Sequence, residues 1–85
     1  MNRRRLLARL SQGSLNNVRF AELSDLTEAF GFTLARVSGS HHIFVHPSIP
    51  ELLNLQEVRG QAKPYQIRQL LRLVERYNLS LEEET

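Results

Sequence analysis

The stretch FTLARVSGSHHIFVH, residues 32–46, decides the fold of this chain. It holds two runs rich in β-branched and aromatic residues, 32–37 and 41–46, separated by the short segment Ser38-Gly39-Ser40. Two such runs joined by a glycine-containing turn are typical of a β-hairpin, because glycine adopts backbone conformations that a side chain disfavours. We therefore predict two antiparallel strands, the second of which is stopped at Pro47.

A helix is expected before the hairpin and a third strand after it. Apolar residues recur at three- and four-residue spacing over 18–30, which predicts a helix with Asn17 as its N-cap and Gly31 at its end. Beyond the prolines, residues 51–56 supply a third antiparallel strand, and the polar residues 57–63 form a loop.

The second expected helix begins at Pro64, which suits a first helical turn because its missing N–H has no partner there. This helix has one apolar face that should pack on the sheet, formed by Ile67, Leu70, Leu71, Val74 and Tyr77. A helix, a three-stranded antiparallel sheet and a helix make an α+β two-layer sandwich.

The two ends of the chain differ in charge. Residues 2–11 predict an extra short helix with Leu6, Leu7 and Leu10 on one side, and the polar residues 11–14 separate it from the rest of the chain. We expect residues 1–16 to form a loosely attached basic arm, 17–79 the folded domain, and 80–85 an acidic tail.

Composition limits the possible functions. The chain has 85 residues, a formal net charge of +2 and no cysteine, so disulfides, thiolate nucleophiles and sulfur-bound zinc are excluded. A domain of this size leaves little room for an enclosed cofactor pocket, and we expect no cofactor. Because no segment approaches the roughly 18 apolar residues of a membrane span, we expect no membrane association and a cytoplasmic location.

The adjacent histidines of the second predicted strand face opposite ways. Strand alternation places His41 on one face and His42, Phe44 and His46 on the other, so a shared metal site is not expected. The aromatic Phe44 favours the inner face for its own set, which leaves His41 at the exposed end of the hairpin, whereas Ile43 and Val45 in the other set favour the opposite arrangement. An imidazole titrates near pH 6.5 and serves as acid or base. The alternative is a pair of hydrogen-bonded strand histidines without chemistry.

The last helix carries a second basic feature. Arg68, Arg72 and Arg76 follow one another at four-residue spacing, with Lys63 just upstream. Like charges so spaced destabilise a helix slightly, which favours a role such as binding phosphates along a nucleic-acid backbone. A solvated helix face is the alternative.

Several runs together resemble one family. They are NVRFAEL (17–23), FGF (30–32), RVSGSHHIF (36–44) and His46-Pro47, and the likeness extends over about residues 17–79. They resemble the HicA (YcfA-like) mRNA interferase toxins of type II toxin–antitoxin systems. The resemblance implies a double-stranded-RNA-binding-domain-like fold, metal-independent cleavage of mRNA without the ribosome, and a HicB-like antitoxin that covers the active surface.

The same resemblance selects site residues. The histidine after Gly-Ser is catalytic in that family, and His41 is the matching position, expected to take the proton from a ribose 2′-OH. The group that protonates the leaving oxygen is left open between His42, His46 and water, while Arg36 or Lys63 would stabilise the phosphorane. The residues expected to contact RNA are Arg36, Ser40, His42, Lys63, Arg68 and Arg72.

Two other interpretations remain from the sequence. The first is a non-catalytic RNA-binding module of the same fold. The second is a protein-interaction subunit that docks a partner through the open sheet face and the leucines of residues 6–10. The glutamines are further candidate contacts peculiar to this chain, at Gln56, Gln61, Gln66 and Gln69.

Overall fold

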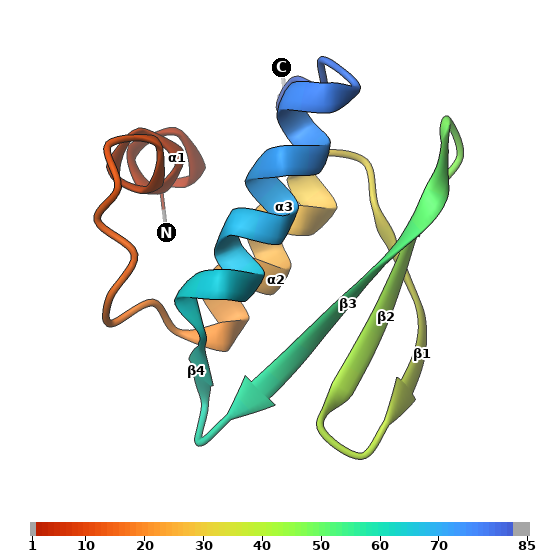
Figure 1. Cartoon of the computed structure of the whole chain (residues 1–85), viewed down its shortest axis with the longest axis horizontal. Helices are drawn as coiled ribbons and strands as arrows, with labels where there is room; N and C mark the ends of the chain where they lie inside the picture. Colours follow the sequence, from red (N-terminus) through yellow and green to blue (C-terminus); the bar gives the residue numbers. More distant parts are fainter. Residues whose placement is uncertain (1, 83–85) are drawn as a thin grey trace.

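The computed structural model describes residues 2–82 and shows a helical layer on one face of an antiparallel sheet (Figure 1). The helices are α1 (Arg3–Ser11), α2 (Phe20–Ala29) and α3 (Pro64–Arg76). The strands are β1 (Thr33–Ser38), β2 (His41–His46), β3 (Ile49–Val58) and β4 (Gln61–Ala62), in the spatial order β1-β2-β3-β4.

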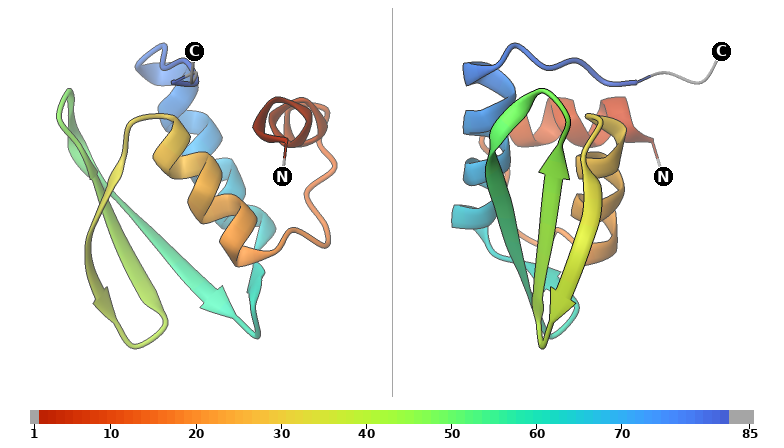
Figure 2. Two further views of the ribbon diagram at one scale, coloured as in Figure 1. Left: turned by 180° about the vertical axis from the view of Figure 1, so that it is seen from behind. Right: turned by 90° about the vertical axis from the view of Figure 1, so that its right-hand side faces the viewer.

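The three helices form one side of the molecule, and the sheet forms the other. Helices α2 and α3 lie side by side against one face of the sheet, and α1 lies beyond them on the side away from β1 and β2 (Figures 1 and 2). The other face of the sheet carries no helix among the described elements. The expected α+β, double-stranded-RNA-binding-domain-like architecture with an added N-terminal helix is confirmed.

The predicted hairpin is confirmed, but its turn is one residue shorter than expected, because Ser38 belongs to the first strand. Ser38 pairs with His41, so the loop between β1 and β2 consists of Gly39 and Ser40. Gly39 has φ 60°, and a positive φ at the first loop position is typical of the type II′ turn, whose twist matches that of the strands. Since no atom lies within 4 Å of a Cβ built on Gly39, the turn needs glycine for its backbone conformation and not for space.

The third strand is longer than expected, and a fourth follows it. The predicted loop at residues 57–63 is wrong, because β3 continues to Val58 and β4 pairs back on it. Arg59 and Gly60 connect them with φ 53° and 76°, the two positive values of a type I′ hairpin turn. A strand of two residues is too short to show a period in the sequence.

Helix α2 starts later than predicted, and Asn17 is not its N-cap. The backbone groups of Val18 and Phe20 instead bond to the hairpin formed by β3 and β4. Ala62 N–H donates to Val18 O, and Phe20 N–H donates to Gly60 O, both at 2.9 Å. Arg19 is therefore the N-cap, and its N–H donates to the Glu22 carboxylate at 3.1 Å. The other end is as predicted, since the helix stops just before Gly31, which has φ 97°.

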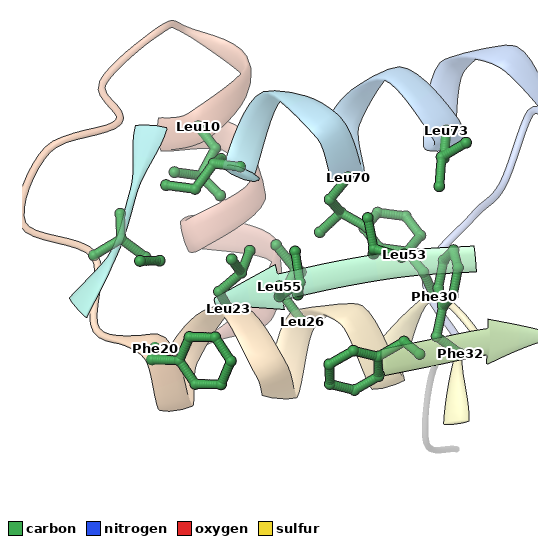
Figure 3. Packing of buried hydrophobic residues seen from close by; sticks show 14 of the residues in the cluster. Leu10, Phe20, Leu23, Leu26, Phe30, Phe32, Leu53, Leu55, Leu70 and Leu73 are labelled. Carbon is green, nitrogen blue, oxygen red and sulfur yellow. The ribbon is translucent and has the colours of Figure 1, made fainter. Parts of the chain in front are cut away.

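The core lies between the helices and the sheet (Figure 3). Its fully buried side chains include Leu23 and Leu26 of α2, Phe44 of β2, and Leu53 of β3. On α3 the expected apolar face is partly shifted. Residues 67 and 70 are fully buried as expected and are joined by Leu73, while Leu71, Val74 and Tyr77 are only partly buried.

Helix α1 is part of this core, so the expectation of a loosely attached arm is wrong. Leu6 and Leu10 are buried at 5% and 1% exposure. Arg3 donates two hydrogen bonds to Asp25 of α2, at 2.9 and 3.0 Å. Leu7, Leu71, Val74 and other residues line a hollow of about 450 Å³ between α1 and α3, which explains the partial burial of Leu71 and Val74.

Candidate active site

The three histidines of the chain all lie on β2, and the strand separates them as the alternation predicts. Phe44 is fully buried, so its neighbours at alternate positions, His42 and His46, face the helices. Their rings contact Phe20 at 4.6 Å and Phe32 at 5.0 Å between ring centroids. His41 points to the helix-free face and is exposed. The inner-face assignment of the Phe44 set is confirmed.

His46 is held by hydrogen bonds at both ring nitrogens. Its Nε2 lies 3.1 Å from the carbonyl oxygen of Phe30, and its Nδ1 accepts the N–H of Ser48 at 3.0 Å. A carbonyl only accepts, so Nε2 carries the proton. A Cβ on Gly31 would lie 2.8 Å from this nitrogen, so the glycine lets the helix end approach the ring. These contacts make His46 a structural residue, and they argue against it as the second proton-transfer group.

His42 contacts the hairpin turn from the helix-facing side of the sheet. Its Nδ1 lies 3.2 Å from the carbonyl oxygen of Ser40, which fixes the proton on Nδ1. The ring is partly buried against Phe20. His42 thereby connects the hairpin loop to the first turn of α2.

His41 has a partner on the neighbouring strand. Its Nδ1 lies 3.1 Å from Oδ1 of Asn54, two residues before Gln56, which is the residue directly opposite His41. Asn54 and His41 share the helix-free face of the sheet. The sequence analysis missed Asn54, because the pairing register of β2 and β3 was not deducible from the residues of either strand.

A chain of polar contacts connects the hairpin turn to the start of α3. Gln56 Nε2 donates to Ser40 Oγ at 3.3 Å, and Gln56 N–H donates to Gln66 Oε1 at 2.7 Å. Gln66 Nε2 in turn lies 3.4 Å from the hydroxyl of Tyr65. Gln66 is only 3% exposed. Among the four glutamines named from the sequence, Gln66 therefore makes its hydrogen bonds in the interior and does not offer a surface contact.

The predicted cations do not form one surface. Arg36 is the register partner of Ile43, which places it on the same sheet face as His41. Lys63 is the exposed N-cap residue of α3. Arg68 and Arg72 are exposed in the helical layer, and Arg68 lines the hollow beside α1. The structure therefore brings Arg36, and not the α3 arginines, onto the face of His41.

Arg76, the third arginine of the series 68, 72 and 76 on α3, is paired with a carboxylate. Arg76 donates to both oxygens of Glu51 at 3.1 Å. The hydroxyl of Tyr77 also donates to this carboxylate, and that bond, followed by the contact with Arg76, lowers the pKa of Glu51. The same bond raises the pKa of Tyr77. A phosphate track along α3 is thus limited to Arg68 and Arg72.

Residues 2–82 contain neither a candidate metal cluster nor a candidate membrane-spanning helix. No three His, Cys, Asp or Glu side chains in this range are grouped so that they could hold a metal ion. No helix in the same range has both the length and the apolar character needed to cross a bilayer.

The comparison with protein families identifies the chain. A family model described as HicA toxin of bacterial toxin-antitoxin matches residues 20–75. No curated protein matches the sequence. The matched segment runs from the start of α2 almost to the end of α3 and includes the hairpin with His41. Since it covers more than half of the 85 residues, the chain belongs to the HicA toxin family of bacterial toxin–antitoxin systems.

Proposed function

We propose that this toxin binds and cleaves mRNA independently of the ribosome, with His41 as the general base. The observation that carries the proposal is the difference between the three histidines. His46 is bonded at both ring nitrogens, His42 is partly buried against Phe20, and His41 presents an exposed imidazole on an open sheet face. A substrate as large as RNA needs such an accessible group.

The proposed reaction is transesterification at phosphorus. Nε2 of His41 takes the proton of a ribose 2′-OH while the 2′-oxygen attacks the adjacent phosphate. The P–O5′ bond breaks, a proton goes from water to the leaving 5′-oxygen, and the products are a 2′,3′-cyclic phosphate and a 5′-OH. His42 does not serve as this acid, because it faces the helices on the other side of the sheet. A positioned base contributes about 10²- to 10⁴-fold to the rate.

Charge on the phosphorane needs a nearby cation, and Arg36 is the residue that supports this role best. It shares the sheet face of His41, because Arg36 pairs with Ile43 two residues along β2 from His41. A guanidinium donates two parallel hydrogen bonds to a phosphate, which suits the extra negative charge of the transition state.

Several further residues are proposed to contact RNA away from the reacting phosphate. Ser40 precedes His41 in the turn, and Lys63 lies at the start of α3. His42 faces the helices, so it would contact RNA only if the RNA also reached that side of the sheet. Arg68 and Arg72 would contact RNA only if it also reached the helical layer. Each phosphate contact that is lost should reduce the salt dependence of binding by about one unit of slope.

The partner proposed for this toxin is a HicB-like antitoxin that covers the helix-free face and thereby His41, and the proposed location is the cytoplasm. Beside the polar site this face offers the exposed large apolar side chain of Leu52, at 64% exposure, and the half-buried Ile43 and Val45. Covering it would block RNA and shield the open surface at once.

The chemistry of the products tests this mechanism. A short RNA incubated with the purified chain should yield fragments with a 2′,3′-cyclic phosphate and a 5′-OH, and DNA of the same sequence should stay intact. Fragments with a 3′-OH and a 5′-phosphate would contradict attack by the 2′-oxygen. RNA binding without any cleavage would instead favour the non-catalytic RNA-binding module.

A further inference from the structure

We propose that Asn54 is a positioning residue that sets the tautomer of His41, an inference that rests on the proposed function of His41 as a base. The contact is between Nδ1 of His41 and Oδ1 of Asn54, 3.1 Å apart. An amide oxygen accepts hydrogen bonds and does not donate them, so the shared proton belongs to Nδ1. A neutral imidazole carries one proton, which leaves Nε2 as the basic nitrogen.

Strand register explains why Asn54 takes this role. In an antiparallel pair, a side chain contacts the residue directly opposite and the diagonal neighbours two positions away. The residue opposite His41 is Gln56, but its side-chain amide donates to Ser40 Oγ and its backbone N–H donates to Gln66. Gln56 is thereby fixed to the turn and to α3, and the imidazole bonds to the diagonal neighbour Asn54.

An amide suits this position better than a carboxylate. Asp or Glu in its place would also hold the Nδ1 proton, but it would put a negative charge beside the phosphate that is to be cleaved. Asn54 orients the ring without that charge. The same face holds the cation Arg36, whose attraction for phosphate a neighbouring carboxylate would weaken.

The tautomer is measurable without RNA. In protein labelled with ¹⁵N at the histidine rings and kept in mildly alkaline buffer, we expect His41 to show a protonated Nδ1 and an unprotonated Nε2. His42 and His46 provide internal references, because their partners fix the proton on Nδ1 and Nε2, respectively. An Nε2-protonated His41 in the unmodified chain would overturn the inference.

Matched variants separate positioning from folding. Asn54→Leu keeps the size of the side chain but removes the acceptor, so the His41 proton should move toward Nε2, and cleavage should fall about 3- to 10-fold. Asn54→Asp retains the acceptor and should keep the proton on Nδ1. Leu52→Ala, on the same strand and face, is the control and should leave the tautomer unchanged. An unchanged His41 spectrum in a folded Asn54→Leu protein would refute the role of Asn54.

The two proposals fail in different ways. If His41→Ala still cleaves RNA, the assignment of His41 as base is wrong, whatever the spectrum of the unmodified protein shows. If His41→Ala is inactive but Asn54→Leu changes neither the ring spectrum nor the rate, His41 is the base and Asn54 does not position it.

Discussion

The side-chain oxygen Oε1 of Gln66 accepts the backbone N–H of Gln56 at 2.7 Å. Strand β4 pairs only with Glu57 and Val58, so it ends before it reaches Gln56. A buried side chain from the first turn of α3 thus satisfies a backbone donor that the short strand leaves without a partner. Because Gln56 lies opposite His41, this bond also connects α3 to the site.

Replacing Gln66 with methionine should destabilise the protein. Methionine keeps the length and most of the volume of glutamine but leaves the Gln56 N–H without an acceptor, which costs about 1–3 kcal/mol. Urea unfolding measures this loss. Gln69→Met, one position before the buried Leu70 on the same helix, is the control, and its free energy of unfolding should change by less than about 0.5 kcal/mol. Equal effects of the two variants would refute the role given to Gln66.

The close approach of Gly31 to His46 predicts a difference between two glycine variants. Gly31 and Gly13 have similar φ values of 97° and 91°, but only at Gly31 would a Cβ meet a neighbour, His46 Nε2 at 2.8 Å. Alanine at Gly13 should cost about 1–2 kcal/mol through backbone strain alone, and alanine at Gly31 should cost more. Thermal unfolding compares the stabilities of the two variants. Equal losses of stability would show that the His46 side chain moves aside at no cost in free energy.

Helix α1 should contribute to stability and not only to charge. Leu10 is 1% exposed, so Leu10→Ala should cost about 2–4 kcal/mol. Leu7 is only partly buried beside the hollow, and Leu7→Ala should cost about 1 kcal/mol or less. Chemical denaturation of the two variants gives both values. If Leu10→Ala were as stable as Leu7→Ala, α1 would not be part of the folded unit.

The bond between Arg3 and Asp25 predicts a pH dependence. Hydrogen bonding to Arg3 lowers the pKa of Asp25 below its ordinary value of about 3.9. A carboxyl with a lowered pKa in the folded state stabilises the protein above the unfolded-state pKa, and the effect is lost as the pH falls through the folded-state pKa. Both side chains are more than a third exposed, so Asp25→Asn should cost at most about 1 kcal/mol at pH 7. That difference should shrink below about pH 4. A difference independent of pH would mean that the ion pair is not its cause.

The sequence predicted the parts of the fold that depend on local pattern. The hairpin around Gly39, the end of α2 at Gly31 and the start of α3 at Pro64 each follow from a residue with a distinctive backbone preference. The start of α2 did not follow, because the hydrogen bonds of Val18 and Phe20 go to the distant β4 hairpin. Local preference was overruled there by a pairing between segments about 40 residues apart.

The outward position of His41, the proposed base, could be predicted from the sequence, but the residues around it could not. Strand alternation and Phe44 placed His41 outward, which is where it lies. Its partner Asn54 depends on the register of β2 with β3, and the neutralisation of Arg76 depends on a contact with Glu51 across the fold. Contacts of this kind arise from tertiary packing, and the periodicity of residues along one helix or strand does not predict them.

Cleavage of RNA by purified His41→Ala protein is the most direct test of the proposed activity. His41 is exposed, so the variant should keep its melting temperature while the cleavage rate falls at least about 100-fold, the lower value for a lost general base. Leu52→Ala, an exposed change on the same sheet face, should keep both its stability and its cleavage. A folded His41→Ala protein that cleaves RNA at the unmodified rate would contradict the assignment of His41 as the base.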